Sequence, residues 1–328
     1  MKKGLRFVAL LLAALMIVGF VVSSISMAYA QDEWDKDVYA YGAGLNQAQI
    51  DETAQLLGIG NMDAVNKVSV GAEDLYKYLK MSGNDASMIS SIFVKKTAED
   101  SGTSVIITTP QNITKVTDVE YSNAAITAGI TDAEIYVGAV RPVTGTSALT
   151  GVYKAFELNG VNLDEGRVAV ANEELETVNA IVQQHKDKED FSSEKINAVV
   201  ADVKEKLIDR KDETNEKATK EEITQIIQNS VQEFNLGDII TQVNIENLAV
   251  YFQNFQNTSA IDSQELKEQV KKLGGNLRGK LQGVLDNSDD LVDSAKEFIN
   301  REETKGFLSS LAEMISNFFQ KIADFFKN

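Results

Sequence analysis

The chain contains no cysteine. It therefore forms no disulfide bonds and offers no thiol to which a lipid anchor could be attached, so its stability must come from a hydrophobic core. Its 328 residues are ample for such a core, and the length is typical of two domains.

Histidine is almost as scarce, because His185 is the only one. It lies among charged residues in QQHKDKED, and this context predicts an exposed helix end. A catalytic triad or a histidine metal site needs a shielded and oriented imidazole. The sequence therefore predicts no catalytic residue, no metal site and no cofactor. A hydrolase that uses only Asp and Glu stays open, because acidic residues are plentiful.

The first 30 residues have the pattern of a secretory signal peptide. Lys2, Lys3 and Arg6 precede an apolar run, and Ala28 and Ala30 supply small residues at the −3 and −1 positions of a cleavage site. We expect cleavage after Ala30 and an extracellular or envelope location for the mature chain. An uncleaved membrane anchor is the alternative.

Positive charge is also in short supply. The formal net charge is −17, and loss of the three basic residues of the signal peptide makes it −20. So acidic a chain is repelled by nucleic acid, and we expect no nucleic-acid partner.

Composition changes near residue 165, which predicts two regions after the signal peptide. Both prolines and most of the glycines lie in residues 31–165, whereas residues 166–328 are proline-free and rich in charge. We expect an α/β domain followed by a helical bundle or an extended hairpin of helices.

In the first region, apolar residues at helical spacing alternate with β-rich runs. SSIFVKKT and TSVIITT are separated by AEDSG, which predicts a hairpin turn. AEIYVGAV at 133–140 is a further apolar β run. The helices are expected at residues 46–57, 72–81, 118–129 and 147–158. The order of these elements indicates a βαβ crossover and a sheet that is at least partly parallel, within an α+β or α/β fold.

In the second region the apolar spacing is helical throughout. Helices are expected around residues 171–182, 196–207, 223–234 and 266–284, the third of them opened by a capping box at Thr219 and Glu222. The charged stretch at residues 209–219 is interpreted as an exposed connection.

Residues 112–157, NITKVTDVEYSNAAITAGITDAEIYVGAVRPVTGTSALTGVYKAFE, resemble the YpuA-like family of exported Gram-positive proteins, which is defined by a domain of unknown function. ITAGI at 126–130 and VTGTSALTG at 143–151 are the most distinctive parts. The resemblance covers residues 40–185, and the helical region only loosely. It implies an exported α/β domain with a helical tail, and it carries over no catalytic residues.

The segment RPVTGTSALT at 141–150 follows an apolar strand and has two interpretations. It is either a turn with a helix cap, or a binding loop for an anion or a sugar hydroxyl at the carboxyl end of a strand. It lacks the lysine of a nucleotide-binding loop. The candidate ligand-binding residues are Arg141, Thr144, Gly145, Thr146, Ser147 and Thr150.

The last segment, residues 306–328, carries an uninterrupted apolar stripe at helical spacing. Packing within the bundle, contact with a partner or a second copy, and peripheral contact with a membrane surface are all open. The candidate contact residues are Phe307, Leu308, Leu311, Ile315, Phe318, Phe319, Ile322, Phe325 and Phe326.

Together these features predict an exported, non-catalytic cell-envelope protein with a structural or protein-interaction role. Its partner is an unidentified envelope component or a second copy of the chain. A small-molecule or glycan-binding domain that uses the loop at 141–150 is the alternative function.

Overall fold

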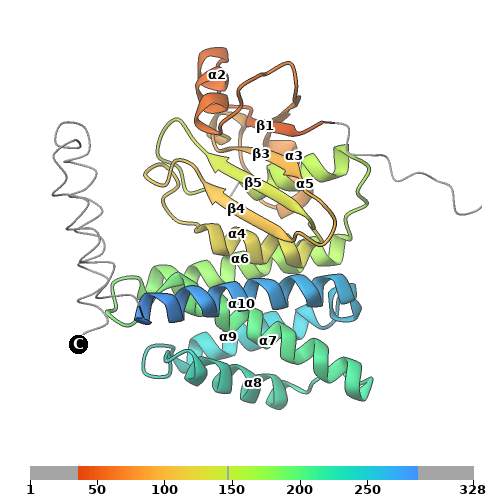
Figure 1. Cartoon of the computed structure of the whole chain (residues 1–328), viewed down its shortest axis with the longest axis vertical. Helices are drawn as coiled ribbons and strands as arrows, with labels where there is room; N and C mark the ends of the chain where they lie inside the picture. Colours follow the sequence, from red (N-terminus) through yellow and green to blue (C-terminus); the bar gives the residue numbers. More distant parts are fainter. Residues whose placement is uncertain (1–35, 146–147, 287–328) are drawn as a thin grey trace, which may run out of the picture. The chain divides into compact units, whose positions relative to one another are not determined.

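The computed structural model describes residues 36–145 and 148–286 (Figure 1). Within them lies one five-stranded sheet of order β2-β1-β3-β5-β4. β1 pairs in parallel with β2, as β4 does with β5, whereas β3 runs antiparallel to both of its neighbours. The sheet is therefore mixed, as expected. Its strands are β1 (Val38–Gly42), β2 (Asn66–Val70), β3 (Ser91–Lys96), β4 (Thr103–Ile107) and β5 (Ala133–Gly138).

The expected hairpin between β3 and β4 is wrong, because β5 lies between them. Asp132, just before β5, holds both ends of the connection: its carbonyl accepts from Thr97 N, and its Oδ1 accepts from Gly102 N at 2.9 Å. Ile135 and Val137 of this central strand are buried. The chain does turn at Asp100–Gly102, where both end residues have a positive φ. The strands on either side of the turn, β3 and β4, do not pair with each other.

The crossover from β4 through α4 (Asp118–Ala128) to β5 is confirmed. Thr117 caps α4 in a capping box with Glu120, and Gly129 ends the helix with a left-handed φ of 92°. Arg167 donates to the carbonyls of Ile126 and Thr127 at the same end. All residues of α4 after Asp118 are buried, because the helix packs on the sheet on one side and on other helices on the other.

The other helices of the first region flank the sheet. α5 packs on β1 and β3, and a separate apolar cluster holds the segment from α2 to Val65 against Tyr39 and Phe93. The helices are α2 (Gln47–Leu56), α3 (Ala72–Leu79) and α5 (Ala148–Leu158), with a short 3-10 helix at Asp85–Ser87.

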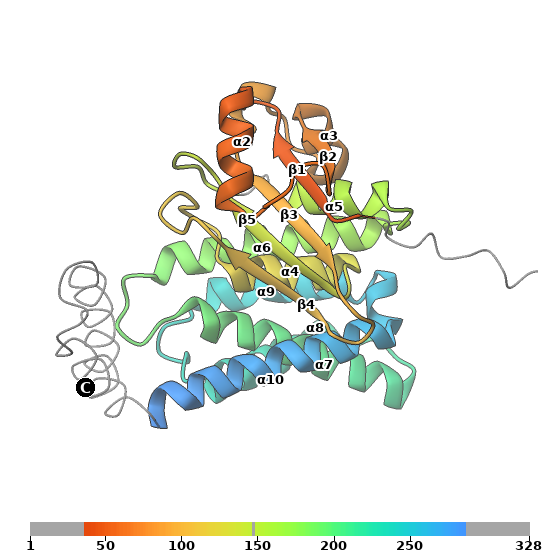
Figure 2. The same cartoon turned by 45° about the horizontal axis from the view of Figure 1, so that its top comes forward.

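The second region is helical, as expected. α6 and α7 lie against α4, and α10 packs along α7 (Figures 1 and 2). Among the described residues, no helix is both long and apolar enough to cross a membrane. The helices are α6 (Glu165–His185), α7 (Ser193–Thr214), α8 (Lys220–Glu233), α9 (Gln242–Phe255) and α10 (Gln264–Asp286), with a 3-10 helix at Ser259–Asp262.

The domain boundary at residue 165 stays a prediction. α6 begins there, but it packs along α4 of the preceding region.

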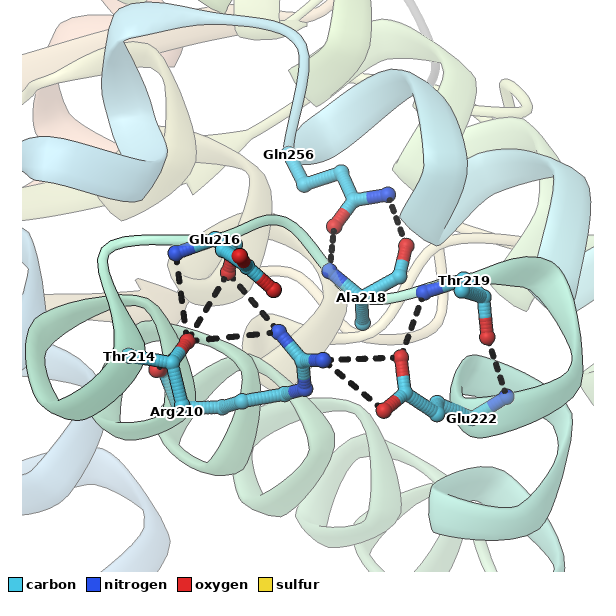
Figure 3. Close-up of polar contacts among 7 residues, drawn as sticks. All are labelled: Arg210, Thr214, Glu216, Ala218, Thr219, Glu222 and Gln256. Atoms are coloured by element: carbon cyan, nitrogen blue, oxygen red, sulfur yellow. Dashed lines mark hydrogen bonds and ion pairs between the residues drawn. The ribbon is translucent and has the colours of Figure 1, made fainter.

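The charged stretch at 209–219 is only partly a connection, since α7 continues through Thr214. Arg210 on α7 donates to both carboxylate oxygens of Glu222, at 2.8 and 2.9 Å (Figure 3). The amide of Gln256 bonds both the N–H and the carbonyl of Ala218, each at 2.9 Å. These side chains fix a turn whose composition alone suggests a loose loop.

A buried ion pair joins the layers. Lys204 on α7 and Glu174 on α6 are 2.6 Å apart, with side chains 0% and 1% exposed. Glu174 also accepts hydrogen bonds from Thr127 of α4 at 2.6 Å and from Tyr251 of α9 at 2.9 Å. Loss of hydration lowers the pKa of Lys204 and raises that of Tyr251. Four helices thus meet at one carboxylate.

We predict that Lys204→Met lowers the free energy of unfolding by about 3–5 kcal/mol, because it leaves the Glu174 charge buried without its partner. The double variant Lys204→Met/Glu174→Gln should recover at least half of this loss, since the amide still accepts from Tyr251 and carries no charge. Urea unfolding measures both.

Lys271→Met is the matched control, because the Lys271 side chain is 61% exposed and its ammonium lies 3.5 Å from Glu205. Its effect should stay within about 0.5 kcal/mol. Equal losses for Lys204→Met and Lys271→Met would contradict a dominant role for the buried pair.

Candidate functional site

The loop at 141–150 serves chain geometry at its described positions. Val143 bridges Ile113, and its N–H and carbonyl bond Asn112 and Thr114. Gly145 is buried at φ +93°, and its carbonyl accepts from the hydroxyl of Tyr121. A Cβ there would meet Tyr121 Oη at 2.6 Å and Ile113 Cγ2 at 2.7 Å. The glycine is therefore required for the turn itself.

The other candidate residues of this loop are spread between surface and core. Arg141 and Thr144 are exposed, and the Thr144 carbonyl accepts from Lys115 N at 3.3 Å. Thr150 is fully buried on α5. Thr146 and Ser147 lie outside the described residues, as do the contact residues of the C-terminal stripe. Ligand binding by this loop stays a prediction.

His185 is buried, which corrects the expected exposed helix end. The residue is 4% exposed, its ring contacts Phe191, and its Nε2 lies 2.9 Å from Asn244 Oδ1. The same oxygen accepts from Thr241 N and Oγ1, so Nε2 is the donor to it. The charged residues that follow His185 do not determine its exposure, because α9 covers the end of α6.

A cleft of about 410 Å³ opens where α3 faces α6, and it is the candidate functional site. Tyr78 and Asn172 lie in its wall and are buried; they join the two helices through a 2.9 Å bond from Asn172 Nδ2 to the Tyr78 carbonyl. Asn172 Oδ1 in turn accepts from Tyr153 of α5 at 3.2 Å. Both functional groups of the amide are thus used to join α6 to α3 and α5.

One end of the cleft is formed by a three-residue polar cluster. Glu157, near the end of α5, accepts hydrogen bonds from Lys77 Nζ and from the Tyr78 hydroxyl. The bond from Lys77 lowers the pKa of Glu157, and the Tyr78 bond acts in the same direction. Burial and this carboxylate both raise the pKa of Tyr78. Glu157 is therefore a carboxylate at neutral pH: it attracts positive charge but has no proton to donate.

The α6 wall of the cleft carries further acidic side chains. Glu165, Glu173 and Glu176 face it, and the first and third of these are exposed. With Glu157 they outnumber Lys77 and Lys80, the two lysines of the lining. The excess of negative charge favours a ligand that carries an amine, and the lining amide and hydroxyl groups suit its other polar groups.

Sequence reasoning missed this cleft. Glu165, Asn172 and Glu176 recur on one face of α6, opposite its apolar face, and that periodicity was a usable signal. No signal in the sequence indicates that Lys77 and Tyr78 pair with Glu157, which lies about 80 positions away. Among the described residues, no group of three or more acidic or histidine side chains has the arrangement of a metal site.

The mixed sheet and its helical layer make this an α+β protein. Its candidate site lies between helices rather than at the ends of the strands. Residues 41–273 match the model of the family described as protein of unknown function (DUF1002), and the chain belongs to this family. It is similar to the uncharacterized protein YpuA of Bacillus subtilis (strain 168), at 27% identity over 256 residues, which cover 78% of this chain and 77% of that protein. The resemblance seen in the sequence is thereby confirmed. No solved structure matches the chain.

We predict that Gly145→Ala lowers the free energy of unfolding by about 1–3 kcal/mol more than Gly58→Ala does. Both glycines have a left-handed φ, but a Cβ at Gly58 meets nothing within 4 Å. The backbone cost is common to the two variants, so the difference reports the contact with Tyr121 and Ile113. Equal midpoints in urea unfolding would show that the turn tolerates a side chain.

Proposed function

We propose that the protein is exported and acts outside the cytoplasm as a non-catalytic binding protein, with the cleft between α3 and α6 as its contact site. The signal-peptide pattern of the first 30 residues supports export. The arrangement that carries the binding proposal is the Lys77–Tyr78–Glu157 cluster together with the acidic wall of α6.

The expected ligand is a small polar molecule or a peptide segment that carries at least one free amine. Exposed carboxylates attract it, and the half-buried side chains of Leu79 and Leu163 in the cleft lining offer contact for an apolar part of the ligand. Such a surface suits a partner that combines positive charge with some apolar character.

Trilysine is a suitable probe for this proposal, and we expect saturable binding to the mature chain at low ionic strength by isothermal titration calorimetry. Glu165→Gln/Glu176→Gln should weaken it about tenfold, or ~1.4 kcal/mol, as expected for the loss of two solvent-exposed ion pairs. A wild-type chain that shows no saturable heat would contradict the proposal.

Glu213→Gln/Glu268→Gln is the matched control, because it removes the same charge from exposed helical positions outside the cleft lining. Its affinity for trilysine should equal that of the wild type. If both double variants weaken binding equally, net charge rather than the cleft attracts the peptide.

Export is tested separately, by expressing the full chain in a Gram-positive host and determining the N-terminus of the released or envelope-bound protein. We expect it to begin at Gln31. Ala30→Arg should block processing, whereas Tyr29→Arg should not, because signal peptidase requires small residues at −3 and −1 only. An unprocessed wild-type chain would favour the membrane-anchor alternative.

A further inference from the structure

The two edge strands of the sheet, β2 and β4, differ in how well they are protected against pairing with a further strand. β2, with sequence NKVSV, carries the exposed Lys67, and Lys154 donates to the carbonyl of Ser69 at 2.8 Å. β4, with sequence TSVII, has no charged residue, and Ile106 is 44% exposed. Unprotected apolar edges promote unwanted strand pairing, and proteins commonly cover them with a helix or a loop.

The backbone of β4 is also available on its outer side. Thr108 N donates to Val137 O of β5 at 2.8 Å, and alternate residues of a parallel pair face the same neighbour. The N–H groups of Val105 and Ile107 therefore point away from β5. No strand of the described chain lies beyond them.

An apolar groove follows this edge. It has a volume of about 390 Å³, and its walls are the strand itself and the connection that leads into α4. Thr117 and Asp118 are its polar residues. The apolar lining consists of Val105, Ile106, Ile107, Pro110, Ile113 and Val116.

The groove lies within reach of the segment that follows α10. Lys272 of α10 donates to the carbonyl of Asp100, just before β4, and α10 also contacts α4. In both views the dark-blue end of α10 lies on the same side as the connection from β4 to α4 (Figures 1 and 2). Residues 287–305 could span up to about 60 Å if extended, so the segment after them can reach the groove.

We propose that the C-terminal stripe, residues 306–328 of the same chain, docks on the β4 edge and places apolar side chains in this groove. The stripe has Phe, Leu, Ile and Met at helical spacing and no polar residue within it. Docking buries apolar surface on both partners and covers the unpaired edge of β4.

Cross-linking tests the proposal directly, because the chain has no native cysteine to interfere. Ile106→Cys is combined in the mature chain with a cysteine at Leu311, Ile315, Phe318 or Ile322, and treated with a short bismaleimide. The controls place the second cysteine at Ser310, Asn317 or Gln320, on the polar face. We expect cross-links within one chain to form at least about fivefold more for the best stripe position than for any control.

Other occupants give different results. Cross-links only between two chains would show that a second copy fills the groove. Absence of cross-links, together with co-sedimentation of the wild-type chain with phosphatidylglycerol vesicles, would assign the stripe to a membrane surface. Equal yields for both faces would show that it does not dock. Each of these results overturns the proposal.

Hydrogen exchange provides a second test that needs no cross-linker. Ile106→Asp places a charge at the groove and should speed amide exchange in residues 306–328 about tenfold. Val250→Asp is the control: Val250 is a similarly exposed apolar residue, 49% exposed on α9, and its replacement should leave that exchange unchanged. An unchanged melting temperature of the core in both variants verifies folding. Equal exchange in the two variants would overturn the proposal.

Discussion

The buried contact between Glu174 and Lys204 is the interaction on which the arrangement of the helices depends. A carboxylate and an ammonium removed from water are tolerated only when their remaining hydrogen-bonding capacity is satisfied. Here that requirement is met by Thr127 on α4 and Tyr251 on α9. Because the partners come from different helices, moving any one of them leaves a buried polar group unsatisfied.

The same helix that supplies Glu174 also supplies the cleft. In α6, Glu174 faces the other helices, while Asn172 and Glu176, two positions to either side, face α3. The buried ion pair of Glu174 therefore fixes the rotation of α6 about its axis. That rotation turns the polar side chains of the opposite face toward the cleft. Arg167, which binds the end of α4, fixes the start of α6 in the same way.

Local signals predicted local structure well. Thr219 with Glu222 and Gly129 were correctly assigned to helix ends, because capping depends on residues only a few positions apart. Long-range features were not predictable. The sequence around Lys204 does not distinguish it from an exposed lysine of a helix, and the charged residues around His185 predict exposure. Nothing in the sequence of β5 shows that it lies between β3 and β4. Each of these depends on an element that arrives from elsewhere in the chain. The cleft shares this limit, since its Glu157 and Tyr78 become neighbours only after α3 and α5 have packed.

The charge distribution connects these observations. The 32 basic residues of the chain are outnumbered by 49 acidic ones. Several of them hold elements together: Lys204 inside the helical layer, Arg210 at the turn into α8, and Lys77 at the cleft. The α6 wall of the cleft combines an excess of carboxylates with a concave shape. Long-range electrostatic attraction favours positively charged groups near such a surface.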